Sequence, residues 1–344
     1  MSRLTRGLAL GVVLAGCRAR GALPCDATGV VCVTLTIPRG ATLSAAVDSL
    51  TAHQLIGTRS LFTVYARLRG LGRSLKSGIY AFRQDARWSE IVSALRIGRG
   101  TLQRFTVPEG LTAVEVADLA AQELGVPRDS FLAAARDPAL LGQLGIAARA
   151  ESAEGYLYPT TYTLRPHLSG RELVRLMTDE FTDHWPRAWQ ARLDTLRMSR
   201  HDVVTLASII QSEVRYAPDR DYVSAVYHNR LRQGMLLQAD PTVVYAMGRR
   251  PHRVYEKNLT IPSPYNTYLH AGLPPGPISQ PDSAALAAAL YPARAPFLYF
   301  VAQPDGKHIF SVSYSEHLAA IRQVKEMQTH APRSRDRALP APPQ

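Results

Sequence analysis

Hydrophobic residues repeat with two different periods along this chain. Residues 31–50 and 77–100 each combine a strand-like alternation, a turn and a helix-like spacing, so we predict a small α+β module over residues 31–105. Beyond that module the helical period dominates, and we predict helices at 113–124, 129–136, 170–196, 202–215, 282–290 and 315–328. Two further helices are predicted, one from near Pro218 to Arg232 and one that begins at Asp240.

Turn-forming residues define the segments between these helices. We predict a loop at 154–164, which is rich in aromatic residues and threonine, and an irregular segment at 262–279, which is rich in proline. The runs FLYFVA and HIFSVS on either side of the turn PDG predict a β-hairpin. The predicted fold class is therefore α+β, with a larger, mainly helical domain over 106–328. Residues 329–344 have the composition of a disordered tail.

The beginning of the chain has the pattern of an export signal. Two arginines precede a short apolar run, Leu8–Ala15, which is too short to span a bilayer as a helix. The run ends in LAGC, which resembles the lipobox of bacterial lipoproteins, in which the cysteine is lipidated and becomes the first residue of the mature chain. We therefore expect an anchor over 1–17 with lipidation at Cys17, and a linker over 18–30.

Two cysteines remain after the one in LAGC. Cys25 and Cys32 would lie in an oxidising compartment, where they could pair and close a small loop. Two unpaired, buried thiols are the alternative that the sequence leaves open.

The stretch LASIIQSEV, residues 206–214, carries one carboxylate in an unexpected place. On a helix, the polar side chains of this region share one arc: Thr205, Ser208, Gln211, Ser212 and Arg215. Glu213 lies instead on the apolar arc, where Leu206, Ile209 and Ile210 precede it. A lone carboxylate at such a position is costly unless it is paired, hydrogen-bonded or protonated.

Two interpretations of Glu213 follow. It could form an ordinary ion pair with one of three arginines: Arg215, Arg220 or Arg230. Alternatively, its apolar neighbours could raise its pKa until it holds a proton near neutral pH. That is the condition for a general acid acting on a glycosidic oxygen.

Amide, hydroxyl and aromatic side chains follow Glu213 along the chain: Asn229, Gln238, Asp240, Thr242, Tyr265, Asn266, Thr267 and Tyr268. Sugar rings stack on aromatic faces, and their hydroxyl and acetamide groups need hydrogen-bond partners, so this is the composition of a sugar cleft. Many ordered surface loops share it. Of the other carboxylates, we interpret Asp240 as a helix cap and Glu154 as a loop charge.

Composition excludes few classes of function. The net charge of +12 is carried almost wholly by arginine, which suits a polyanion or an anionic membrane surface but also arises from compositional bias. The sequence has no basic run with interleaved aromatics, no RNP-like strand and no zinc-finger spacing, so we expect no nucleic-acid partner. No HExxH, GxSxG, P-loop or GxGxxG pattern occurs, and we expect neither a metal nor a cofactor.

Five stretches together carry a resemblance to a known family: LASIIQSEV, VSAVYHNRLRQGMLLQADPTVVYAMG, SPYNTYLHAGLPPGPISQP, FLYFVAQPDGKHIF and EGYLYPTTY. They resemble the MltG (YceG-like) family of endolytic murein transglycosylases over residues 106–328. The module at 31–105 fits the LysM-like domain of that family more loosely, and ordinary packing would explain its pattern about as well.

The resemblance implies a catalytic role for one residue. In the family a single glutamate at the end of the ASI helix is catalytic, and the matching position here is Glu213. The family motif commonly has a second glutamate two residues earlier, where this chain has Gln211. The family also usually has an N-terminal transmembrane helix, which the short LAGC signal replaces here, so the mode of membrane attachment is open.

The predicted function is that of a membrane-anchored, periplasmic lytic transglycosylase. It would cleave the β-1,4 bond between N-acetylmuramic acid and N-acetylglucosamine in nascent peptidoglycan strands and leave 1,6-anhydro ends. We expect glycan contacts from four residues and support from two more: Tyr158, Gln238, Asn266 and Tyr268, then Asn229 and Asp240. Peptidoglycan synthases are candidate partners. The alternative is a non-catalytic scaffold that binds peptidoglycan, although a scaffold has no need of a carboxylate on an apolar stripe.

Overall fold

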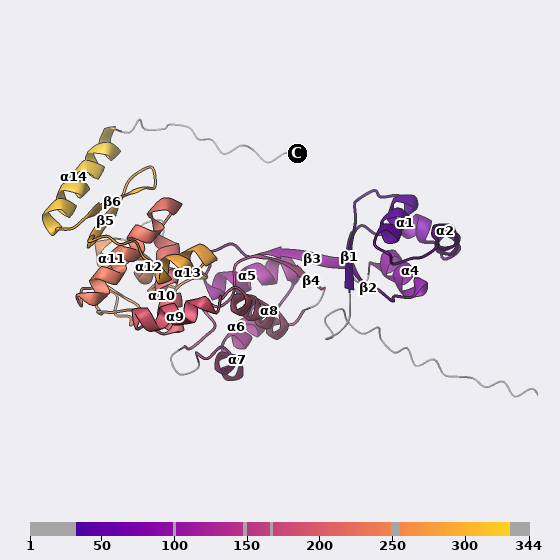
Figure 1. The fold of residues 1–344 in the computed structure, drawn as a ribbon, viewed down its shortest axis with the longest axis horizontal. Coiled ribbons are helices and arrows are strands. Elements are labelled where there is room, and N and C mark those ends of the chain that lie inside the picture. The colour runs from indigo at the N-terminus through magenta and orange to yellow at the C-terminus, as the bar shows by residue number, and fades with distance from the viewer. Residues whose placement is uncertain (1–31, 99–100, 147–149, 166–167, 249–254, 331–344) are drawn as a thin grey trace, which may run out of the picture. The chain divides into compact units, whose positions relative to one another are not determined.

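The structure is a computed structural model of the 344-residue chain (Figure 1). It describes residues 32–98, 101–146, 150–165, 168–248 and 255–330. The chain divides into two units, Met1–Leu102 and Gln103–Gln344, which are described separately. Both units mix helices and strands, and this confirms the predicted α+β class.

The first unit packs helices against a small antiparallel sheet. Its strands are β1 (Cys32–Ile37), β2 (Gly78–Arg83) and the start of β3 (Thr101–Thr106), with Leu35 opposite Tyr80 in the β1–β2 ladder. Its helices are α1 (Leu43–Ala52), α2 (Arg59–Leu68), α3 (Leu71–Ser74) and α4 (Trp88–Ile97). Both predicted strand–helix pairs, β1–α1 and β2–α4, are therefore confirmed, whereas α2 and α3 were not predicted. The likeness of this unit to LysM domains stays a prediction.

Local signals and burial explain these elements. The side chain of Thr42 accepts a hydrogen bond from the Ala45 N–H (3.2 Å) and so caps the start of α1. Alternate residues of β1 and β2 face the helices, and Leu35 and Tyr80 are fully buried with Phe62 and Ile91.

The second unit is mainly helical. The rest of β3 pairs with β4 (Thr161–Leu164), and a hairpin is formed by β5 (Tyr299–Ala302) and β6 (His308–Ser311). Its longer helices are α5 (Ala113–Leu124), α6 (Arg128–Ala135), α8 (Gly170–Asp183), α9 (Ala188–Leu196), α10 (Arg200–Glu213), α11 (Arg220–Arg232), α13 (Ser283–Leu290) and α14 (Tyr314–His330). Shorter helices are α7 (Pro138–Gln143), η1 (Ala217–Asp219), α12 (Asp240–Ala246) and η2 (Glu256–Asn258).

Helix α10 lies in the middle of this unit and packs against α13 (Figure 1). Its residues from Val203 to Ile210 are all buried, and these include Thr205 and Ser208 of the predicted polar arc, whereas Ser212 and Arg215 at the other end of that arc are exposed. The proline-rich segment covers the arc at Ser208, whose hydroxyl accepts the Ile278 N–H at 3.0 Å and donates to the Thr205 carbonyl at 2.7 Å. Over residues 203–210 the expected amphipathic helix is therefore a core helix, in which the buried Ser208 hydroxyl bonds to backbone groups.

Two predicted segments differ from the structure. The helix predicted over 170–196 is divided into α8 and α9. Pro186 lies between them, and a proline disfavours the helical conformation of the residue before it, here Trp185. The loop predicted over 154–164 contains strand β4. The hairpin and the irregular proline-rich segment are confirmed.

The N-terminal predictions fall mostly outside the described residues. Cys17 and Cys25 lie there, whereas Cys32 is disulfide-bonded. Within the described ranges, no helix is both long and apolar enough to cross a bilayer.

Candidate active site

The second unit contains a cleft of about 1220 Å³. Its walls are the start of α5, the end of α10, α12 and the turn of the β5–β6 hairpin. Seven acidic side chains line it against a single arginine, Arg215. A carboxyl group in such surroundings retains its proton more readily than one in water, because neighbouring negative charges oppose its ionisation.

Glu213 is the last residue of α10 and lies in this cleft. Its side chain is half-buried, and its Oε1 accepts a hydrogen bond from the Tyr227 hydroxyl at 3.1 Å. A helix C-terminus carries partial negative charge, which also disfavours a carboxylate at this place.

The pKa of Glu213 is raised from 4.5 to about 7. Burial is the largest cause and the negative charge of Asp240 is the second, whereas the hydrogen bond from Tyr227 acts in the opposite direction. A carboxyl with this pKa holds a proton at neutral pH for a large part of the time and can still give it up, as general acid–base chemistry requires.

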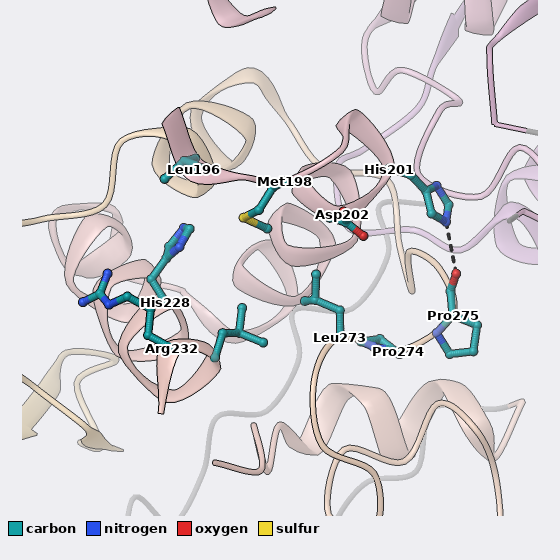
Figure 2. A pocket seen from close by; sticks show the side chains of 10 residues that line it. Leu196, Met198, His201, Asp202, His228, Arg232, Leu273, Pro274 and Pro275 are labelled. Atoms are coloured by element: carbon teal, nitrogen blue, oxygen red, sulfur yellow. Dashed lines mark hydrogen bonds between the residues drawn. The ribbon is translucent and has the colours of Figure 1, made fainter. Parts of the chain in front are cut away.

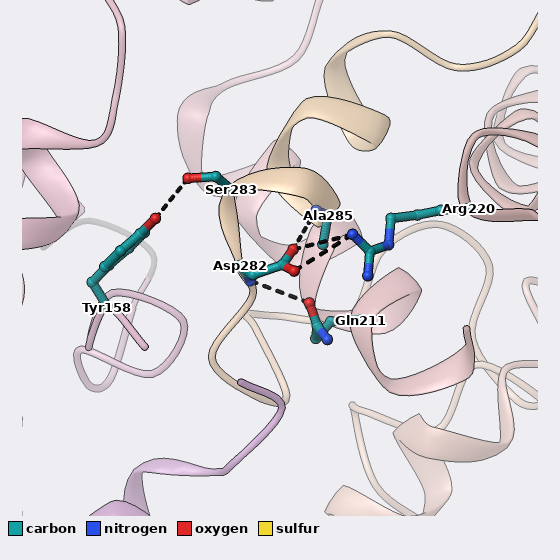
Figure 3. Close-up of polar contacts among 6 residues, drawn as sticks. All are labelled: Tyr158, Gln211, Arg220, Asp282, Ser283 and Ala285. Carbon is teal, nitrogen blue, oxygen red and sulfur yellow. Dashed lines mark hydrogen bonds and ion pairs between the residues drawn. The ribbon is translucent and has the colours of Figure 1, made fainter. Parts of the chain in front are cut away.

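The ion pairs that the sequence left open for Glu213 are absent from the described part of the chain. Figure 3 shows that Arg220 pairs instead with Asp282, with 3.4 Å between Nη1 and Oδ1. Asp282 caps α13, and its own N–H donates to Oε1 of Gln211 at 3.2 Å. Arg230 is buried and donates to the carbonyl oxygens of Leu237 (2.8 Å) and Leu298 (2.7 Å).

Asp240 also lines the cleft, where its Oδ1 accepts a hydrogen bond from the Tyr268 hydroxyl at 2.6 Å. The interpretation of Asp240 as a helix cap is wrong. The cap position of α12 is Ala239, Asp240 is the first helical residue, and its side chain makes no capping hydrogen bond. The Asp-Pro pair predicts a helix whose first residue is Pro241, whereas α12 begins one residue earlier, at Asp240.

Glu154 is a second buried carboxyl in the same cleft, and its interpretation as a loop charge is wrong. It is 5% exposed and accepts hydrogen bonds from the Ala113 N–H (2.9 Å), the Tyr245 hydroxyl (3.3 Å) and the Gln280 amide. Burial raises its pKa to about 7 against the opposing effect of these donors. The aromatic residues that follow Glu154, in the run EGYLYPTTY, favour its burial but do not indicate its partners.

The other predicted residues lie around the cleft but do not line it. Gln238 is exposed with φ of 51°, and its Oε1 is 3.4 Å from Nη1 of Arg230. Asn266 is fully buried and donates to two backbone carbonyls at 2.9 Å each. Asn229 likewise donates to the carbonyls of residues 295 and 297, at 2.9 and 2.7 Å.

Tyr158 contacts the first residue of α13. Its hydroxyl is 2.6 Å from the Ser283 hydroxyl (Figure 3), and its ring stacks on His184 with 4.1 Å between ring centres. The structure therefore brings together Glu213, Asp240 and, through Asp240, Tyr268. Glycan contacts by Tyr158, Gln238 and Asn266 stay predictions. The structure does not favour these contacts, because none of the three residues lines the cleft.

A smaller pocket of about 640 Å³ lies between α11, the α9–α10 junction and the proline-rich segment (Figure 2). Its two histidines bond to backbone carbonyls: His201 to Pro275 at 3.1 Å and His228 to Ala289 at 2.8 Å. Neither Glu213 nor Glu154 reaches this pocket. The larger cleft is thus the candidate active site. No group of histidine, cysteine or acidic side chains within the described ranges has the arrangement of a metal site.

Comparisons with known proteins identify the family of this chain. Residues 35–323 match the model of the YceG-like family. The endolytic murein transglycosylase of Bacillus subtilis is 30% identical over 308 residues, which are 86% of this chain and 85% of that protein. The endolytic murein transglycosylase of Streptococcus pneumoniae strain D39 is 26% identical over 326 residues, or 86% of this chain and 59% of the relative.

A solved structure shows the same similarity. The crystal structure of a yceG-like protein from Listeria monocytogenes superposes with a TM-score of 0.61 and 31% sequence identity, over 84% of this chain and 98% of that one. Since the family model spans most of the chain and a relative is 30% identical over most of its own length, the chain belongs to the YceG-like family.

Proposed function

We propose that this protein is a murein lytic transglycosylase that uses Glu213 as its acid and base. The observation that carries the proposal is a half-buried carboxyl, raised in pKa to about 7, in a cleft large enough for several sugar rings. The names of the relatives in Bacillus and Streptococcus support the substrate class.

In the first step, protonated Glu213 donates its proton to the glycosidic oxygen between N-acetylmuramic acid and N-acetylglucosamine. The bond from the muramic C1 to that oxygen breaks, and the N-acetylglucosamine leaves with a free hydroxyl. The positive charge that develops at C1 lies in an acidic cleft, where the carboxylate of Asp240 favours it.

In the second step, Glu213, now a carboxylate, removes the proton of the muramic C6 hydroxyl as its oxygen bonds to C1. The product is a 1,6-anhydro ring, and the carboxyl regains its starting proton. Tyr227 assists because its hydroxyl hydrogen-bonds to the ionised carboxylate between the steps.

Six other acidic side chains line the cleft, and two of them are candidates for a second catalytic carboxylate: Glu154, whose pKa burial raises, and Asp240, whose charge acts on Glu213. A hydrolase uses a second carboxylate as nucleophile or to activate water. Glu154 accepts bonds from three donor groups and is 5% exposed, so its oxygens are occupied, and Asp240 is held by Tyr268. The C6 hydroxyl belongs to the bound substrate and reacts intramolecularly, which favours it over water by proximity.

We further propose that the protein acts on nascent strands outside the cytoplasmic membrane, held there by a lipid on Cys17. The sequence LAGC supports this proposal. Two acyl chains would be required for stable attachment, because one gives only marginal binding. The intact mass of the membrane-extracted protein tests it, since a chain that retains Met1 or an unmodified Cys17 would refute lipid anchoring.

The function is tested by Glu213→Gln in a digest of purified peptidoglycan. Removal of a general acid–base group lowers rates by about 10² to 10⁴, and here one group acts twice. Glu123→Gln is the matched control, because Glu123 is an exposed glutamate of α5 outside the cleft. Equal turnover of the two variants would refute the role of Glu213, and no cleavage by the folded wild type would favour the scaffold alternative.

A further inference from the structure

Helix α2 of the first unit exposes three large apolar side chains along one side. Leu61, Val64 and Leu68 are 61%, 56% and 82% exposed, and their spacing of three and four residues puts them on one helix face. The other side of α2 is already used by the core, in which Phe62 and Ala66 are fully buried. Single exposed leucines are ordinary, whereas a contiguous stripe marks a contact surface.

Cationic side chains flank the end of the apolar stripe of Leu61, Val64 and Leu68 along the chain and follow it. Arg67, Arg69, Arg73 and Lys76 are exposed, and within the described ranges none of them forms an ion pair. The sequence contains no aspartate or glutamate between residues 49 and 84. Arg59 at the start of α2 is paired with Asp48 at 2.6 Å, so the unpaired positive charge belongs to the end of α2 and the residues that follow it, from Arg67 to Lys76.

The end of α4 is linked to the residue after α2 by a side-chain hydrogen bond. The guanidinium of Arg96 donates to the carbonyl oxygen of Arg69 at 3.0 Å, so the last turn of α4 lies beside the end of α2. Ile97, the last residue of α4, is 55% exposed.

We propose that the stripe of Leu61, Val64 and Leu68 docks the first unit onto an anionic phospholipid surface. An amphipathic helix lies in the interface with its apolar face in the boundary between headgroups and acyl chains. Its arginines reach the headgroups, where their charge is attracted to anionic lipid and their stems remain in apolar surroundings. This surface is independent of the cleft and of the proposed cleavage.

Other occupants fit less well. A polyanion without apolar groups would satisfy the arginines but leave the leucines in water. A second copy of the chain would bring the same arginines against one another, and like charges at an interface oppose association. An anionic bilayer satisfies both features.

The test uses the full chain reconstituted in vesicles, with a genetically encoded fluorescent amino acid at position 64. Brominated acyl chains quench the fluorophore only if it enters the lipid. The matched control carries the fluorophore at Leu176, an exposed apolar residue of α8 in the second unit. We expect strong quenching at position 64, and little at position 176, in vesicles that contain phosphatidylglycerol.

Charge is tested in the same assay. Each basic residue near an anionic surface strengthens binding roughly 5-fold, so Arg67→Gln, Arg69→Gln and Arg73→Gln together weaken docking by about 100-fold. The control variant removes three exposed arginines of the second unit, Arg175, Arg187 and Arg197, and leaves docking unchanged. In neutral phosphatidylcholine vesicles, the wild type docks as weakly as the variant without Arg67, Arg69 and Arg73 docks in anionic vesicles.

Three results would overturn the proposal. The first is equal quenching at positions 64 and 176. The second is equal quenching in neutral and anionic vesicles. The third is an environment at position 64 that becomes apolar without lipid as the protein concentration rises, because a second copy would then be the occupant.

Discussion

Replacing Glu213 by glutamine should stabilise the protein at high pH while it removes the proposed catalyst. The pKa of this carboxyl is 4.5 in an unfolded chain and about 7 in the fold. Between these values the folded state binds more protons than the unfolded state, so stability falls as pH rises through the window. Above pH 7 the fold contains an ionised carboxylate in surroundings that disfavour it, and glutamine has no such charge.

The magnitude follows from the two pKa values. A difference from 4.5 to about 7 corresponds to an upper limit of about 3 kcal/mol, at about 1.4 kcal/mol per pKa unit. Glutamine resembles the protonated acid and can still accept the hydrogen bond from Tyr227. The stability advantage of Glu213→Gln should therefore grow by about 2 to 3 kcal/mol from about pH 5 to about pH 8.

The assay is urea unfolding of the wild type and the variant at both pH values. Glu172→Gln is the control of opposite sign, because the Ser169 N–H lowers the pKa of this exposed carboxyl. The ionised form of Glu172 stabilises the fold above the ordinary pKa of 4.5, so this variant should be less stable than the wild type by nearly the same amount at both pH values. A Glu213→Gln variant whose advantage does not change with pH would refute the raised pKa of Glu213 and the reasoning from burial.

Three more changes probe the cleft. Asp240→Asn removes the charge that opposes ionisation of Glu213, so the alkaline limb of the pH–rate profile should move to lower pH; an unmoved limb would show that Asp240 does not act on Glu213. Tyr227→Phe removes a donor to the same carboxylate and should move that limb to higher pH, which a shift in the other direction would contradict. Glu154→Ala leaves the Ala113 N–H and the Tyr245 hydroxyl without their partner, and calorimetry should show a loss of about 3 kcal/mol, whereas a loss below about 0.5 kcal/mol would contradict the proposed structural role.

Most helices and the hairpin could be predicted from the sequence because their signals are local. The cap at Thr42 and the turn PDG are examples, since each depends on a few neighbouring residues. Helix α2 was missed because its sequence, RSLFTVYARL, has β-branched and aromatic residues at positions that obscure the helical spacing, and its exposed Leu61 and Leu68 do not mark a buried face.

The candidate site was predictable in part. Glu213 could be found because its apolar neighbours are adjacent along one helix. Glu154 could not be placed, since its partners Ala113, Tyr245 and Gln280 lie far from it in the sequence and only the fold brings them together. Asn266 was misleading for a different reason: its amide bonds to backbone within its own loop, and composition alone does not distinguish such an amide from one that faces a ligand.

The central claim is that Glu213 drives intramolecular attack by the muramic C6 hydroxyl, and the mass of the products tests it most directly. Intact glycan strands digested with the wild-type protein should give 1,6-anhydromuramic ends, each lighter by one water than the product of a hydrolase, from cuts within the strand. Reducing muramic acid ends alone would contradict the account, because water would then be the nucleophile and Asp240 or Glu154 its activating carboxylate.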